Sequence, residues 1–241
     1  MKTLTTVLAV MALLASVPAP AHGRLADISV YDRSEGRWLQ VYRHEGRAYV
    51  VGRPGHEYQI RIANRLREDL LAVMSVDGVN VITGQTANPS QSGYVIAPRA
   101  ALEVQGWRKS LAQTAAFYFT ALPDSYAART GRPDDVGVIG VALFRRKPEP
   151  RPSAPIAPEA SSGARAAQER SDARLGTGHG RQEHSPAVHV TFDRATSAPE
   201  EIIALYYDSR TNLVARGIIR DPIQVAPNPR PFPGFVPDPW G

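Results

Sequence analysis

The sequence contains no cysteine in its 241 residues. Disulfide bonds, catalysis by a thiolate and attachment of a lipid to a cysteine are therefore all excluded. The stability of the fold must come instead from the burial of apolar side chains. A chain of this length has enough residues for one large domain or two small ones.

Lysine is also scarce, since 25 of the 28 basic residues are arginine. The arginines are spread along the chain, and 23 acidic residues reduce the net charge to +5. Proteins that bind nucleic acids usually gather basic residues on one face. We therefore expect no nucleic-acid partner.

Known catalytic motifs are missing as well. Ser92 does not stand in the G-x-S-x-G pattern of a nucleophile elbow. His56 and Glu57 do not open an HExxH zinc motif, because Tyr58 to Ile60 follow them in a segment with strand periodicity. The sequence therefore predicts no cofactor, and it leaves metal binding open.

Residues 1–21 have the three features of a secretory signal peptide. Lys2 supplies a positive charge, residues 4–17 form an uncharged apolar run, and residues 19–21 (APA) form a small-x-small cleavage site. The apolar run is shorter than the roughly 20 residues that span a bilayer. We expect cleavage after Ala21, a periplasmic or secreted mature protein, and no membrane span after cleavage.

Apolar residues alternate with polar ones through most of residues 22–146. Tyr58, Ile60 and Ile62 point to one face of a strand, while the residues between them point to the other. The Asp77-Gly78 pair between two apolar runs is a strong hairpin signal. The expected strands are 27–31, 37–42, 47–52, 58–62, 70–76, 79–83, 94–97, 101–105, 116–121 and 136–145. Many short strands without a long amphipathic helix indicate an all-β protein, a β-sandwich of jelly-roll-like form.

The composition changes beyond this domain. Residues 147–174 are rich in proline and alanine and hold almost no large apolar side chain, which predicts a disordered linker. Residues 175–220 form a C-terminal β block with expected strands at 188–192, 201–208 and 213–219, the last two joined as a hairpin. Such a small block makes a poor independent core, so we expect it to dock on the first domain. Residues 221–241 form a proline-rich tail.

Two groups of segments carry a resemblance to a known family. The first comprises residues 75–84 (SVDGVNVITG), 93–95 (GYV), 106–110 (GWRKS) and 136–141 (VGVIGV). The second comprises residues 176–181 (GTGHGR), 207–209 (YDS) and 212–215 (NLVA). Together they resemble an uncharacterised family of exported proteobacterial β-rich proteins. The resemblance implies an exported β-rich protein, and because no activity is established for the family, it implies no chemistry.

The glycine-dense segment around residue 178 is the candidate binding site. Gly176, Gly178 and Gly180 permit unusual backbone conformations, and a loop of this kind turns successive N–H groups toward an anion. His179 and Arg181 would be the contacting side chains. The alternative is a tight structural turn where the chain re-enters the fold.

Other residues have both a chemical and a structural interpretation. His179, His184 and His189 recur every five residues and could ligate a metal, but this spacing matches neither one helical face nor one strand face. His22 would be the new N-terminus after cleavage, and it could chelate copper as in a histidine brace. Asp77, with Asn80 and Thr83, could ligate a cation, although a hairpin turn explains these residues without one.

The sequence thus favours an exported, non-catalytic binding or structural module of the bacterial envelope, with an unknown envelope ligand or protein as its partner. The alternative is a metal- or histidine-dependent enzyme with its site at Gly176 to Gly180.

Overall fold

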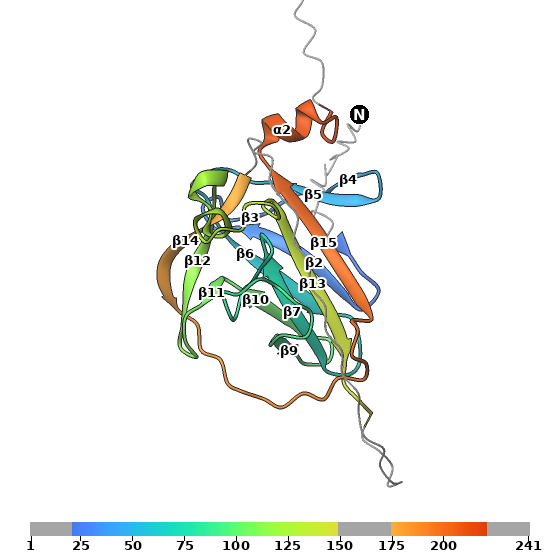
Figure 1. Cartoon of the computed structure of the whole chain (residues 1–241). Helices are drawn as coiled ribbons and strands as arrows, with labels where there is room; N and C mark the ends of the chain where they lie inside the picture. Colours follow the sequence, from blue (N-terminus) through green and yellow to red (C-terminus); the bar gives the residue numbers. More distant parts are fainter. Residues whose placement is uncertain (1–20, 149–174, 221–241) are drawn as a thin grey trace, which may run out of the picture.

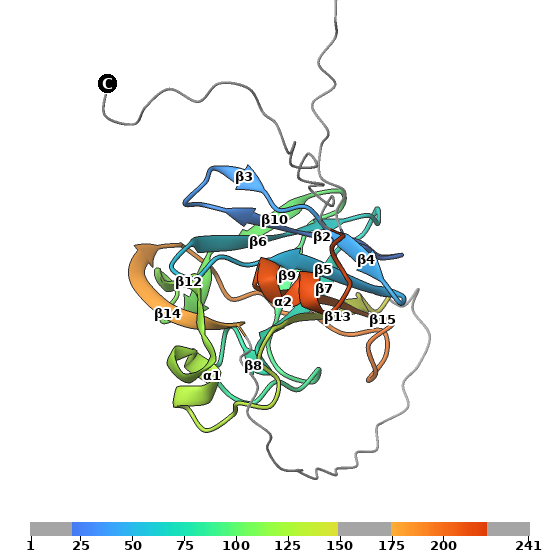
Figure 2. The same cartoon turned by 90° about the horizontal axis from the view of Figure 1, so that it is seen from above.

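A computed structural model describes residues 21–148 and 175–220, and it is an all-β structure of two sheets. Residues 1–20 of the expected signal peptide, residues 149–174 of the expected linker and the proline-rich segment 221–241 lie outside the described residues. The two sheets face each other around a shared core (Figures 1 and 2). Ile28 and Ile60 contribute to this core from one sheet, and Val141 and Leu143 contribute from the other.

The first sheet, sheet A, has eight strands in the order β1-β2-β6-β12-β11, with three strands paired beside this path. β3 pairs with β2, β10 pairs with β6, and β14 pairs with β12. Its strands are β1 (Ala21–His22), β2 (Ala26–Asp32), β3 (Arg37–Trp38), β6 (Glu57–Asn64), β10 (Ala101–Val104), β11 (Gly106–Arg108), β12 (Gln113–Ala121) and β14 (Leu175–His184).

The second sheet, sheet B, has seven strands in the order β4-β5-β15-β13-β7-β8, with β9 paired to β7. The pairing of β5 with β15 is parallel. Its strands are β4 (Tyr42–His44), β5 (Arg47–Val51), β7 (Leu70–Val76), β8 (Val79–Asn80), β9 (Tyr94–Ile96), β13 (Val138–Arg145) and β15 (Glu201–Asp208). The short helices are η1 (Leu122–Asp124), α1 (Tyr126–Arg129) and α2 (Arg210–Ala215). No helix of the described residues is long and apolar enough to cross a membrane.

The runs at residues 70–76 and 136–144 are apolar on both faces, a pattern typical of central strands. β7 lies between β13 and the short strands β8 and β9, and β13 lies between β15 and β7. The predicted Asp77-Gly78 hairpin joins β7 to β8, with positive φ angles of 52° and 70° at its two turn residues. Such angles match the twist of antiparallel strands.

The C-terminal segment differs from the expected hairpin block. β14 joins sheet A and β15 joins sheet B, so the two strands extend different sheets. The strand expected at 213–219 is replaced by helix α2, which begins where the Ser209 hydroxyl accepts a hydrogen bond from the backbone N–H of Asn212. This N-cap satisfies an end group of the helix. Leu213 then packs with Tyr49 on the outer face of sheet B.

Candidate functional site

The glycine-dense segment is part of a strand, and the expected loop is not formed. Gly176, Gly178 and His179 pair with β12 in an antiparallel register, opposite Thr120, Tyr118 and Phe117. The backbone of this strand is extended, and none of Gly176, Gly178 and Gly180 has a positive φ angle. In an extended strand successive backbone N–H groups point to opposite sides, so they do not converge on one anion as those of a turn can. The loop expected to cradle an anion is therefore replaced by a strand.

Close packing explains why these positions are glycine. A Cβ atom built on Gly178 would lie 2.1 Å from Cζ of Tyr118, and one on Gly180 would lie 2.7 Å from the carbonyl oxygen of Ala116. On Gly176 it would lie 2.5 Å from Cβ of Ser125. Side chains at these positions would collide with β12 and with the turn before α1.

The two side chains proposed for that site, His179 and Arg181, are used in other contacts. The Arg181 guanidinium forms ion pairs with Glu57 and Glu183, and its hydrogen bond to Glu57 raises its pKa. The His179 ring lies 5.6 Å from the ring of Tyr126, and its partial burial, aided by Lys109, lowers its pKa. Arg181 therefore serves to link strands within sheet A.

The three evenly spaced histidines do not form a metal centre. Within residues 21–148 and 175–220, the one group of three potential metal ligands consists of Asp32, Glu35 and His56. There the Asp32 carboxylate already accepts hydrogen bonds from the backbone N–H groups of Ser34 and Glu35, and its other oxygen lies 2.8 Å from Nδ1 of His56. Glu35 also pairs with two arginines. The protein itself thus supplies partners for this cluster. His22 lies beside Asp27, 3.0 Å from its carboxylate.

A buried polar cluster connects the two sheets. The Asp77 carboxylate accepts hydrogen bonds from the Tyr207 hydroxyl at 2.5 Å, the Thr177 N–H at 2.7 Å and the Gly137 N–H at 2.9 Å. The Thr177 hydroxyl lies 2.6 Å from the hydroxyls of both Tyr207 and Tyr58. Burial raises the Asp77 pKa from 3.8 to about 6, although its hydrogen bonds act in the opposite direction. Asp77 is occupied by protein donors, so it serves the fold and not a cation.

A long extended segment, residues 185–194, connects β14 toward β15 and is called the strap here. Figure 1 shows it running round the end of the molecule between the two strands. Apolar and polar residues alternate at 188–192, a pattern that predicts a strand there. The structure forms no strand at these residues. In the described part of the chain, no backbone N–H of residues 188–192 donates a hydrogen bond. This stretch has the sequence of a strand but lacks a partner strand.

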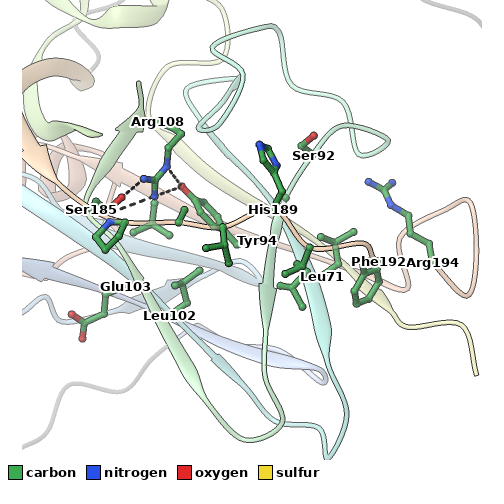
Figure 3. Close-up of a pocket in the computed structure, with 17 residues that line it drawn as sticks. Leu71, Ser92, Tyr94, Leu102, Glu103, Arg108, Ser185, His189, Phe192 and Arg194 are labelled. Atoms are coloured by element: carbon green, nitrogen blue, oxygen red, sulfur yellow. Dashed lines mark hydrogen bonds between the residues drawn. The ribbon is translucent and has the colours of Figure 1, made fainter. Parts of the chain in front are cut away.

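The strap is fixed at both ends by arginines. At its start, the Arg108 guanidinium binds the carbonyl and hydroxyl of Ser185 and the hydroxyl of Tyr94. At its end, the Arg194 guanidinium donates to the carbonyl oxygens of residues 89–91 and lies 4.3 Å from the ring centre of Phe144. Figure 3 shows the two arginines at opposite ends of the strap, with His189 between them.

A pocket of about 520 Å³ lies between the strap and the two sheets. Leu71 and Val95 line it from sheet B, Leu102 and Val104 line it from sheet A, and Phe192 lines it from the strap. In Figure 3 the Glu103 side chain points away from the strap, and it accepts a hydrogen bond from Gln59. The strap therefore bridges the space between the sheets without filling it.

Two strap side chains are the clearest sign of an unfilled site. Val188 is 81% exposed and Val190 is 59% exposed, although both line the pocket. Large aliphatic side chains are normally buried, and neighbouring exposed ones indicate an interaction surface. We call this pocket, with its strap, the strap pocket.

Comparison with known proteins gives no match. Neither a protein-family model, nor a curated protein, nor a solved structure matches the chain. The site must therefore be interpreted from its own geometry.

The sequence contained one usable signal for the strap pocket. Residues 188–192 have the alternation of a strand, and Leu111, Val188 and Val190 are apolar residues that remain exposed. Their exposure depends on the absence of a partner strand, which the sequence does not reveal. The roles of Arg108 and Arg194 as anchors could not be found from composition, because arginine is common throughout the chain.

Proposed function

We propose that the protein is an exported, non-catalytic binding module of the bacterial envelope, and that its ligand occupies the strap pocket. The observation that carries this proposal is the pair of exposed valines on the strap, which line a pocket together with the apolar side chains of Leu71, Val95 and Leu102. A ligand with apolar groups would remove both surfaces from water, which stabilises a complex by about 25 cal/mol per Å² of apolar area buried.

Export is supported by the pattern of residues 1–21, with its positive charge, short apolar run and small-residue cleavage site. Pockets that bind small molecules or peptides commonly combine an apolar lining with a few fixed polar groups. Here Arg108 and Tyr94 are fixed by hydrogen bonds at one end of the strap.

Site-specific photo-crosslinking in cells tests this function. A photoreactive amino acid at Val190 should give adducts, because that side chain faces the ligand. The matched control is the same amino acid at Ile202, which is 65% exposed and lies outside the strap pocket. Adducts at position 190 above the level at 202 support binding at the strap. Equal or absent crosslinking at both positions would show that the strap pocket is not a binding site.

A further inference from the structure

Three strands or strand-like segments at the strap pocket have backbone edges without a partner. Among the described strands, β9 pairs only with β7 and β10 pairs only with β6, so each has one edge without a partner strand there. Both strands line the pocket. The strap contributes residues 188–192, whose N–H groups donate no hydrogen bond within the described residues. A ligand entering this pocket therefore meets backbone donors and acceptors together with apolar side chains.

This combination discriminates between classes of ligand. An acyl chain would bury apolar surface but would leave the backbone groups of the strap without partners, which costs free energy when they are removed from water. An extended polypeptide supplies both kinds of contact, because its backbone pairs with a free edge while alternate side chains enter the apolar pocket.

The charge of the site favours an acidic polypeptide. All hydrogen-bond partners of Arg108 and Arg194 in the described chain are uncharged hydroxyl and carbonyl groups. Two positive charges therefore lie at the two ends of the strap, and no carboxylate of residues 21–148 or 175–220 forms an ion pair with either. The one carboxylate that lines the pocket, on Glu103, points away from the strap (Figure 3).

We infer that the strap pocket binds an extended polypeptide segment with alternating apolar residues and acidic flanks, added as a β-strand beside residues 188–192. This inference rests on the proposed binding function. Val188, Val190 and Phe192 are spaced two residues apart, which is the spacing that would place them on one face if the strap paired with an added strand. Arg108 and Arg194 would attract the acidic flanks, and added salt would weaken this attraction.

The test measures binding of the full chain to a fluorescently labelled synthetic peptide in which valine and threonine alternate between two glutamates. One control peptide has its alternate amide nitrogens methylated, which blocks pairing at a strand edge. A second has lysines in place of the glutamates. Laurate serves as the acyl-chain probe.

The protein variants are chosen at exposed positions so that the fold is retained. Val190→Pro removes one strap N–H and keeps an apolar side chain, and Val190→Asp places a negative charge in the site. The matched control, Ile202→Asp, makes the same apolar-to-acidic change at an exposed residue away from the strap pocket. Circular dichroism and melting temperature verify that all three variants fold.

The expected result is saturable binding of the glutamate-ended peptide, weakened about tenfold or more by amide methylation, by Val190→Pro and by Val190→Asp. The lysine-ended peptide should bind more weakly, and Ile202→Asp should bind like the unaltered protein. Equal binding of the methylated peptide, preferential binding of laurate, or no binding of any peptide would overturn strand addition. If crosslinking at position 190 persists in those cases, the binding function stands and only its ligand class is wrong. A concentration-dependent dimer that excludes the peptide would instead identify a second copy of the chain as the occupant and would also overturn the inference.

Discussion

The carboxyl group of Asp77 should make the stability of the protein depend on pH in an unusual direction. Its pKa is 3.8 in an unfolded chain and about 6 in the fold, because burial disfavours the charged form. The folded state therefore holds a proton more tightly than the unfolded state. The stability contribution of this proton is fully present below pH 3.8 and is lost as the pH rises through about 6.

The size of this contribution follows from the two pKa values. A difference of one pKa unit corresponds to 1.36 kcal/mol, so the change from 3.8 to about 6 corresponds to about 3 kcal/mol. The neighbouring hydroxyls of Tyr58 and Tyr207 do not titrate in this range, because burial and the Asp77 charge raise both pKa values well above 10. A second carboxylate, that of Asp135, lies near the Asp77-Gly78 turn, because the Asp135 side chain packs against Gly78.

The assay is urea unfolding from about pH 4 to about pH 8 for the unaltered protein and for Asp77→Asn. The amide cannot titrate, and its NH₂ group would face a donor, which adds a cost of about 1–3 kcal/mol that does not vary with pH. Subtracting the two curves removes the titration of all other groups. The unaltered protein should lose roughly 2.5 kcal/mol relative to the variant between about pH 4 and about pH 8, most of it below about pH 6, because part of the full difference is already lost at pH 4.

Parallel curves would show that the pKa of Asp77 is the same in the folded and unfolded states. A difference that grows in favour of the unaltered protein with rising pH would show that the three hydrogen bonds outweigh burial. Either result would refute the reasoning from burial.

Three further predictions concern separate parts of the molecule. Gly178→Ala should lower stability by about 1–3 kcal/mol, because its Cβ would lie 2.1 Å from the Tyr118 ring; thermal unfolding should show this cost largely removed in a Tyr118→Ala background, and an equal cost there would contradict the packing argument. Glu183→Gln should cost about 2 kcal/mol in urea unfolding, because its largely buried carboxylate accepts two hydrogen bonds from Arg33. The exposed control Glu45→Gln should change stability by less than about 0.5 kcal/mol, and equal effects of the two substitutions would argue against a special role for Glu183. Intact mass of the exported protein should correspond to cleavage after Ala21, whereas a full-length mass in the membrane fraction would exclude it.

Strands flanked by clear turn signals could be predicted from the sequence. The apolar runs that became β7 and β13 were identifiable as central strands because both of their faces are apolar. Alternation likewise located β6 and β15, since each buries alternate side chains against the core.

Features that depend on long-range pairing could not be predicted. The glycines at 176–180 suggested a turn, whereas their cause is the close approach of Tyr118 and Ala116, which requires the register with β12. The helix α2 has the apolar residues of a strand, and the Ser209 cap and the apolar surface around Tyr49 decide in favour of a helix. The strap has a correct strand pattern without a partner, because a pattern reports side-chain alternation and not the presence of a neighbouring strand.

The position of β15 between β5 and β13 also determines how the chain can fold. Sheet B is incomplete until β15, a strand near the end of the described chain, has paired with both β5 and β13. Folding of this sheet therefore depends on contacts between distant segments. Such topologies fold slowly. β13 lies in sheet B and β14 in sheet A, so the chain changes sheets in the connection between them. A chain cut within that connection should therefore behave as two complementing fragments, in which the smaller fragment supplies the strand that joins the two parts of sheet B.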